Sequence, residues 1–169
     1  LSRTQATKLL YMVENPKVNQ VLKDLGIKEI RLAPPYEFGL SEQANIDPRE
    51  RVIYLNVDAE DPVNAILHEA GHQKFRDLPP EEQKALIEAV KESDSPILQG
   101  YLSVGKYEEA IAEAWYNYPS EFRKIQARAE ELKKLPPPPE SPPFAIRKGE
   151  IIYETPTGER YTVLLRNVE

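Results

Sequence analysis

The sequence predicts an α+β fold in which helices cover a small β-sheet. Two short runs, residues 27–32 and 52–57, are rich in branched and aromatic side chains, which pack well on a pleated surface. Elsewhere, apolar residues recur at helical spacing in segments bounded by Pro, Gly and capping residues. Because 40% of the 169 residues are hydrophobic, the chain can form one main core with a small appendage.

The first elements are two short helices within residues 2–25, where apolar side chains follow a helical period and Pro16 begins the second helix. Gly26 ends that helix, and residues 27–32 form the first strand. A loop then leads to the second strand, residues 52–57. We expect these two strands to belong to one sheet.

A longer helix over Pro62–Arg76 is predicted next, because Asp61 can accept hydrogen bonds from free amides at its start. Proline also suits the first helical position, where a missing amide costs nothing. Another helix follows over residues 81–92, where apolar positions again recur at helical spacing. Residues 93–106 are rich in turn-forming residues and are expected to connect this helix to the next.

Residues 107–135 predict two further helices, the second capped by Ser120. The run PPPPESPP, residues 136–143, cannot supply a continuous hydrogen-bond ladder and is expected to be an extended linker. Strands at 150–153 and 161–165 flank a turn and predict a β-hairpin. The expected organisation is a main domain at 1–135, a linker at 136–143 and a hairpin appendage at 144–169.

Composition excludes several classes of function. A net charge of −6 and a pI near 5.2 argue against a nucleic-acid partner, because such sites need clustered Lys and Arg. No apolar run approaches the roughly 20 residues that span a bilayer. Cysteine is absent, so any metal must be bound by His, Asp or Glu. Oligomeric state and localisation stay open, and a secreted, virion-associated or toxin-associated setting is compatible with the sequence.

The two histidines of the chain, His68 and His72, flank Glu69 in an H-E-x-x-H pattern within the predicted helix Pro62–Arg76. Residues four apart share one helix face, which lets both imidazoles reach one ion while Glu69 lies toward its open side. Zinc suits two imidazoles and a carboxylate, with a fourth position left for water. The pattern therefore predicts a zinc site on this helix.

A carboxylate must supply the third ligand, since the chain has no further histidine. Asp77 is close in sequence but follows the helix end. Glu109 is the better candidate, because it lies on an alanine-rich helix that can approach the first helix closely. Glu113, one turn on, would orient either a ligating histidine or the helix itself. Glu108 is the competing ligand.

These motifs together resemble the zincin metallopeptidases of the anthrax lethal factor type, which include the bacterial Pro-Pro endopeptidases. The family's catalytic helix reads H-E-x-G-H, as residues 68–72 do. Its later helix reads roughly E-x-F-A-E-A-F, which residues 109–115 match except for Ile111 in place of Phe and Trp115 as the final aromatic residue. The similarity covers residues 61–115.

The resemblance assigns a role to each residue of the site. It implies that His68, His72 and Glu109 are zinc ligands and that Glu69 is the general base. It implies a supporting role for Glu113, outside the ligand set.

The family also uses a tyrosine before the third-ligand helix to stabilise the oxyanion. Tyr101 is the candidate for this role, although its spacing from the ligand Glu is one residue longer than in the family, and Tyr107 is the alternative. The implied function is a zinc-dependent endopeptidase that hydrolyses a peptide or protein substrate. Two alternatives are a catalytically degenerate zincin serving as an interaction module in a larger toxin, phage or secreted assembly, and a purely structural zinc site.

Overall fold

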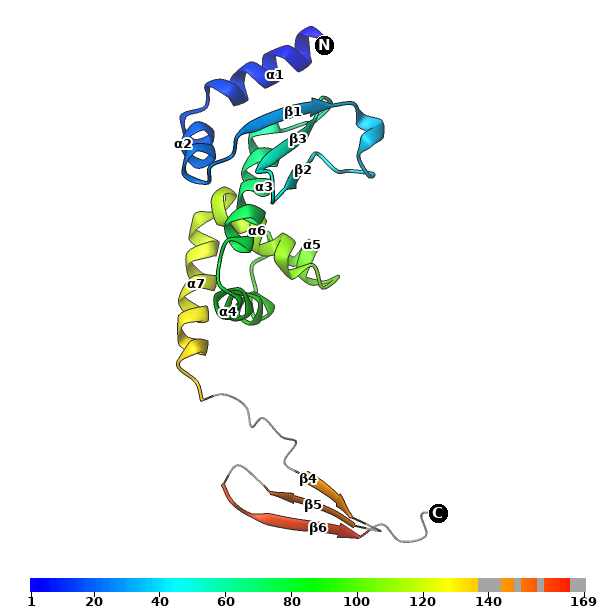
Figure 1. Cartoon of the computed structure of the whole chain (residues 1–169), viewed down its shortest axis with the longest axis vertical. Coiled ribbons are helices and arrows are strands. Elements are labelled where there is room, and N and C mark those ends of the chain that lie inside the picture. Colours follow the sequence, from blue (N-terminus) through cyan, green and yellow to red (C-terminus); the bar gives the residue numbers. More distant parts are fainter. Residues whose placement is uncertain (137–143, 148–149, 155–156, 165–169) are drawn as a thin grey trace. The chain divides into compact units, whose positions relative to one another are not determined.

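The structure is a computed structural model that describes residues 1–136, 144–147, 150–154 and 157–164 (Figure 1). The chain divides into two compact units, Leu1–Lys134 and Leu135–Glu169. The helices of the first unit are α1 (Arg3–Glu14), α2 (Pro16–Asp24), α3 (Pro62–Arg76), α4 (Pro80–Lys91), α5 (Gln99–Leu102), α6 (Tyr107–Asn117) and α7 (Pro119–Lys133). Its strands are β1 (Glu29–Ala33), β2 (Ala44–Asp47) and β3 (Val52–Asn56), and a 3₁₀ turn spans Pro35–Glu37.

The structure confirms that the strands near Ile30 and Ile53 belong to one sheet. In the order β1-β3-β2, β1 runs parallel to β3 with Ile30 opposite Ile53, and β2 runs antiparallel to β3. The strand β2 was not predicted, because its four residues, ANID, have only two apolar side chains and precede a turn. It forms one edge of this sheet, and its residues line part of the candidate site described below.

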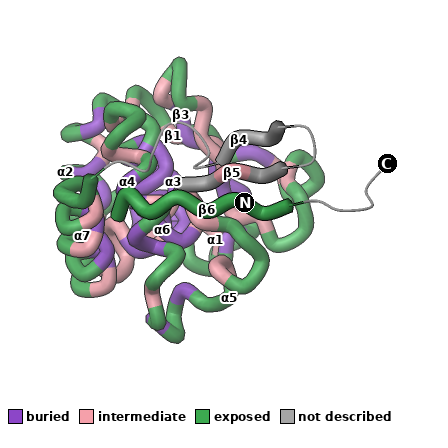
Figure 2. Tube along the Cα trace, turned by 90° about the horizontal axis from the view of Figure 1, so that it is seen from below, coloured by how far each residue is buried: buried purple, intermediate pink, exposed green. Residues whose placement is uncertain are grey.

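Helix α3 lies at the centre of the unit, between two hydrophobic clusters (Figures 1 and 2). On one side Ile66 and Ala70 pack with α1, α2 and the inner face of β3. On the other side Phe75 packs with residues of α4, α6 and α7. Because both clusters contact α3, the helix is held against the sheet and against α6 at the same time.

The helix boundaries largely follow the predicted capping signals. The Asp61 side chain accepts a hydrogen bond from the Asn64 amide at 3.0 Å, with Pro62 in the first turn of α3. The cap predicted at Ser120 is wrong: α7 begins at Pro119, so Ser120 lies inside the helix. Proline fixes a helical φ and needs no amide partner, so the helix starts there without a side-chain cap. The turn-rich segment before α6 also contains the short helix α5.

The second unit contains a three-stranded antiparallel sheet, β4 (Phe144–Arg147), β5 (Glu150–Glu154) and β6 (Arg160–Leu164), in the order β4-β5-β6. The predicted hairpin strands correspond to β5 and β6, with Ile152 opposite Thr162, whereas β4 was not predicted. Pro137 to Pro143 of the predicted linker, and Leu165 of the predicted hairpin, lie outside the described residues.

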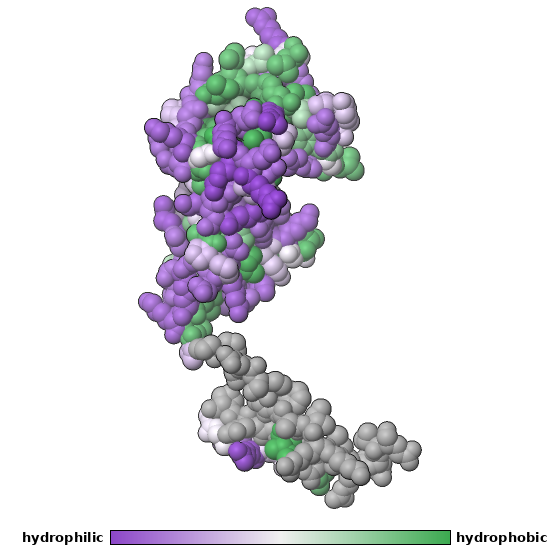
Figure 3. Space-filling model, in the orientation of Figure 1, coloured by the Kyte–Doolittle hydropathy of each residue, from purple (hydrophilic) through white to green (hydrophobic). Residues whose placement is uncertain are grey.

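Hydrophilic side chains cover much of the visible face of the first unit, and hydrophobic ones gather toward the end that carries α1 (Figure 3). The exposed large hydrophobic residues of α1 are Leu10, Tyr11 and Val13. Within the described residues, no helix has the length and apolarity that crossing a membrane requires.

Candidate metal centre

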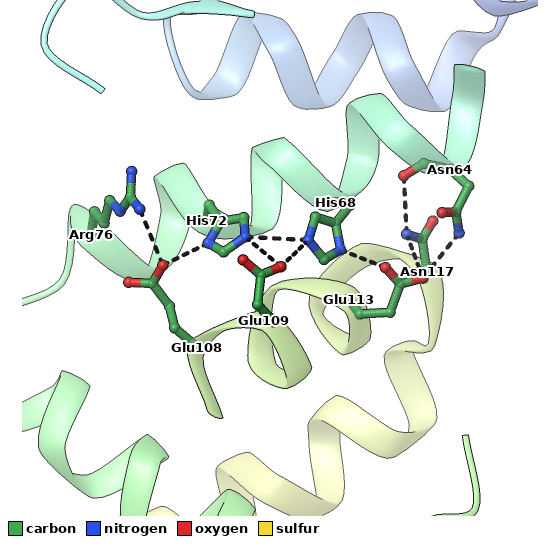
Figure 4. A network of polar contacts seen from close by, with 8 residues as sticks. All are labelled: Asn64, His68, His72, Arg76, Glu108, Glu109, Glu113 and Asn117. Carbon is green, nitrogen blue, oxygen red and sulfur yellow. Dashed lines mark hydrogen bonds and ion pairs between the residues drawn. The ribbon is translucent and has the colours of Figure 1, made fainter. Parts of the chain in front are cut away.

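Two helices bring the candidate residues together along facing polar stripes (Figure 4). On α3 the stripe recurs every four residues and consists of Asn64, His68, His72 and Arg76. On α6 and its C-terminal end it consists of Glu108, Glu109, Glu113 and Asn117. At the N-terminal end of the α3 stripe, Asn64 contacts Glu113 in the C-terminal half of α6. At the other end, Arg76 contacts Glu108 near the N-terminus of α6. The two helices therefore run antiparallel here.

Three side chains converge on one point between these helices. Nε2 of His68 lies 3.2 Å from Nε2 of His72. Oε2 of Glu109 lies 2.7 Å from the first of these nitrogens and 3.1 Å from the second. These three side chains could therefore hold one metal ion.

The three donor atoms fit a tetrahedral ion in both chemistry and size. Zinc in proteins binds imidazole nitrogen and carboxylate oxygen at about 2.0–2.2 Å, which places neighbouring ligand atoms roughly 3.3–3.6 Å apart. The observed separations of 2.7, 3.1 and 3.2 Å lie below this range, so the three atoms would move slightly apart to form one triangular face of such a tetrahedron. Among the described residues, the ligand group consists of these three side chains, which leaves a fourth vertex without a protein ligand.

The second ring nitrogen of His68 is held by a carboxylate. Its Nδ1 lies 2.5 Å from Oε2 of Glu113. The other oxygen of Glu113 accepts hydrogen bonds from the side-chain amides of Asn64 at 3.1 Å and Asn117 at 3.4 Å. Because Nδ1 is occupied in this way, Nε2 of His68 is directed toward the ligand triangle.

A second carboxylate lies on the outer nitrogen of His72. Nδ1 of His72 is 2.7 Å from Oε2 of Glu108, and the Arg76 guanidinium donates to the same oxygen at 3.2 Å. Glu108 therefore lies outside the ligand triangle that includes Glu109. Asp77 is also elsewhere, in a two-point ion pair with Arg51 at 2.9 Å.

Electrostatics in the metal-free site are dominated by the carboxylates around the two imidazoles. Burial disfavours charged imidazoles, but hydrogen bonds to Glu109 and Glu113 outweigh it and raise the pKa of His68 to about 10. Burial is likewise outweighed at His72, whose pKa is raised to about 9 by Glu108 and Glu109. The same hydrogen bonds hold the pKa of Glu109 far below its usual range. Without a metal, the site is therefore a cluster of ion pairs.

Glu69 and Tyr101 both line an open cleft of about 630 Å³ beside the ligand triangle. Glu69 is buried, and burial raises the pKa of its carboxyl to about 7 despite the two nearby imidazoles. The Tyr101 ring lies 6.2 Å from the His68 ring, measured between centroids. Burial, together with Glu113 and Glu109, raises the pKa of Tyr101 to about 12, so its hydroxyl stays protonated at neutral pH.

Tyr107 has different surroundings from Tyr101. Both rings pack against the second hydrophobic cluster, but the described lining of the cleft includes Tyr101 and not Tyr107. The Lys91 ammonium lies 5.3 Å from the Tyr107 ring centroid. The opposite wall of the cleft comes from β2 and the residues before it, including Leu40, Glu42 and Ala44.

Sequence reasoning missed the roles of Asn64, Arg76 and Asn117, and it treated Glu108 only as a competing ligand. The signal was present in the four-residue recurrence, since Asn64 and Arg76 extend the His68–His72 spacing by one step at each end, and Asn117 extends the step from Glu109 to Glu113. Such spacing shows only that residues share one face of a helix. The contacts between the two faces depend on how α3 packs on α6, which the spacing does not specify.

In three comparisons with known proteins, no family model, no curated protein and no solved structure matched the chain. The assignment of a metal centre therefore rests on the geometry of His68, His72 and Glu109.

Proposed function

We propose that the protein is a zinc-dependent endopeptidase with a zincin-like site, as the resemblance to the lethal factor type implies. One observation carries the proposal: the His68, His72 and Glu109 ligand atoms converge beside a cleft of about 630 Å³ that Glu69 and Tyr101 also line. A purely structural zinc would need a fourth protein ligand, whereas the group found in the described residues has three.

When bound, zinc would polarise the scissile carbonyl and lower the pKa of a water molecule toward about 7. His68, His72 and Glu109 would hold the ion through one atom each. The Glu113 carboxylate, on the outer nitrogen of His68, orients that ring. The α3–α6 pair thus positions all three of the ligand residues.

Glu69 acts as the general base in this proposal. Its carboxyl lines the cleft and lies on α3 between the two ligating histidines in sequence. Burial raises the pKa of this carboxyl to about 7 in the metal-free site. A pKa near neutrality suits a group that takes a proton from the attacking water and gives it to the leaving amine. A neighbouring cation would favour the ionised form that accepts the proton.

Tyr101 stabilises the oxyanion that develops on the scissile carbonyl. Its hydroxyl is a donor at neutral pH, and the raised pKa of about 12 keeps it protonated in alkaline solution as well. A single positioned donor of this kind typically contributes about 2–4 kcal/mol to transition-state stabilisation. The position of Tyr101 on the cleft wall favours it over Tyr107 for this role.

The substrate of the proposed enzyme is an extended peptide segment. Strand β2 is an edge strand of the sheet, and its residues Ala44, Asn45 and Ile46 line the cleft. An extended chain can add to such an edge through main-chain hydrogen bonds. A peptide bound in this way would pass in front of the ligand triangle, because one cleft contains both.

The test is hydrolysis of a library of unstructured peptides by the zinc-loaded protein and by a Glu69→Gln variant. The variant should retain zinc and lose about 10²–10⁴-fold in kcat/KM, because the base is removed while the ligands stay. Zinc content and the liberated amino termini are measured on the same samples.

Undiminished turnover by Glu69→Gln would reject the mechanism. Absence of cleavage by a parent protein that carries one zinc would reject the endopeptidase function. It would favour the alternative hypothesis, a catalytically degenerate interaction module. Glu42→Gln, which also changes a cleft carboxylate but leaves the ligand group intact, controls for a simple loss of negative charge in the cleft.

A further inference from the structure

We propose that Glu108, anchored by Arg76, is a second positioning residue of the metal centre and orients His72 as Glu113 orients His68. The ligand pair is then held by two carboxylates, one at each end of the site. This inference rests on the metal centre of the proposed function and not on peptide hydrolysis.

The first support is the geometry at His72. Oε2 of Glu108 lies 2.7 Å from Nδ1, while Nε2 of the same ring lies in the ligand triangle. The His72 side chain is only 6% exposed, so its Nδ1 has little access to water as an alternative acceptor. A neutral imidazole that donates from Nδ1 presents the lone pair of Nε2 to a metal, so Glu108 selects the binding tautomer.

The second support is that Glu108 is itself held in place. Arg76 donates to the same oxygen that contacts His72, at 3.2 Å, and comes from the next turn of α3. His72 and Arg76 therefore contact the same Glu108 carboxylate from one face of α3 (Figure 4). A carboxylate that merely balanced the start of α6 electrostatically would not need this paired contact.

The third support is the matching arrangement at His68. Glu113 contacts Nδ1 of His68 and is anchored by the amides of Asn64 and Asn117. Glu108 and Glu113 thus lie at opposite ends of the ligand triangle, each on the outer nitrogen of one histidine. Removing either should loosen one ring while leaving the other ring held.

The test measures zinc affinity by competition with a chromogenic chelator for the parent, Glu108→Ala and Glu108→Gln. Glu108→Ala should weaken zinc binding about 10- to 100-fold, the range found when outer carboxylate partners of ligating histidines are lost. Glu108→Gln should recover part of this loss, because its amide oxygen can still accept from Nδ1. The cobalt-substituted Glu108→Ala protein should show altered visible absorption, which reports the ligand field directly.

The matched control is Glu81→Ala. Glu81, like Glu108, is an acidic residue in the first turn of its helix, but it belongs to α4, away from the ligand group. The Glu81→Ala substitution should leave zinc affinity and the cobalt spectrum unchanged. Arg76→Met provides a second variant that retains Glu108, and it should weaken zinc binding by less than Glu108→Ala.

The proposal is overturned if Glu108→Ala folds, binds zinc within about twofold of the parent and gives the parent cobalt spectrum. It is also overturned if Glu108→Ala and Glu81→Ala weaken zinc equally, since that would indicate a general charge effect. A parent that binds neither metal overturns both this inference and the proposed function. A parent that binds zinc without cleaving peptides overturns only the proposed function.

Discussion

At the scale of single residues, the two ring nitrogens of each histidine have separate tasks. Nε2 of His68 and of His72 lies in the ligand triangle, while each Nδ1 contacts a carboxylate. A histidine placed at helical spacing without such partners could rotate or take the wrong tautomer. We therefore expect these carboxylates to contribute to metal affinity without being ligands.

A residue-scale prediction concerns Tyr101. Tyr101→Phe removes the hydroxyl but keeps the ring, so it should lower kcat about 10²–10³-fold with little change in KM or zinc affinity. Steady-state kinetics on a cleaved peptide, with zinc content measured in parallel, check this. Tyr107→Phe is the control and should be close to the parent, because the described lining of the cleft does not include Tyr107. Equal losses in both variants would contradict the assignment.

At the scale of elements, the site depends on how closely α3 approaches α6. A Cβ built on Gly71 would meet the Ala112 backbone, with the Ala112 Cα and carbonyl carbon both 2.8 Å away. Real side chains do not tolerate such contacts, so glycine at this position permits the close approach. The alanine-rich sequence of α6 was expected to allow this packing, and the contact between the two helices confirms it.

The element-scale prediction is that Gly71→Ala pushes the two helices apart. Overpacking of this kind typically costs about 1–3 kcal/mol of unfolding free energy, and the shift of α6 should also weaken zinc binding by moving Glu109. Urea unfolding and zinc competition measure the two effects. Gly100→Ala is the matched control, because no atom lies within 4 Å of a Cβ built there. A Gly71→Ala protein as stable as the Gly100→Ala protein would contradict the role given to the contact.

At the scale of the whole molecule, the stability of the metal-free fold depends on pH through the ion pairs of the site. The pKa values of His68 and His72 are raised from 6.5 to about 10 and about 9, so their ion pairs stabilise the metal-free fold fully below about pH 6.5. This contribution is lost as the pH rises through 9 and 10. The lowered pKa of Glu109 gives a contribution that is present above pH 4.5 and lost in acid.

The whole-molecule prediction follows from competition between metal and protons. Zinc requires neutral imidazoles, so its binding must release the protons that the metal-free site holds. The rise in Tm caused by zinc should therefore be larger at about pH 8.5 than at about pH 6. Free zinc at about 100 times its Kd should add about 2.7 kcal/mol to the unfolding free energy. Calorimetry with zinc or with a chelator measures the difference, and an effect of zinc that falls with rising pH would contradict the ligand assignment.

The sequence by itself determined the local features of this protein. Apolar periodicity and the Asp61 cap located α3, and the four-residue spacing placed His68 and His72 on one of its faces. The lack of cysteine and of further histidines required a carboxylate as third ligand. The location of α3 and the shared face of the two histidines were confirmed, because distances within a helix follow from residue spacing alone. The carboxylate ligand stays a prediction, which the position of Glu109 beside both imidazoles supports.

Only the tertiary structure decided which carboxylate contacts which nitrogen of the two histidines. Glu108 and Glu109 are neighbours in sequence, yet Glu109 joins the ligand triangle and Glu108 contacts the outer nitrogen of His72. The edge strand β2, whose sequence predicted a loop, forms the facing wall of the cleft. The physical reason is that contacts between distant segments depend on how helices and strands pack, and residue spacing does not specify the rotation or separation of one element relative to another.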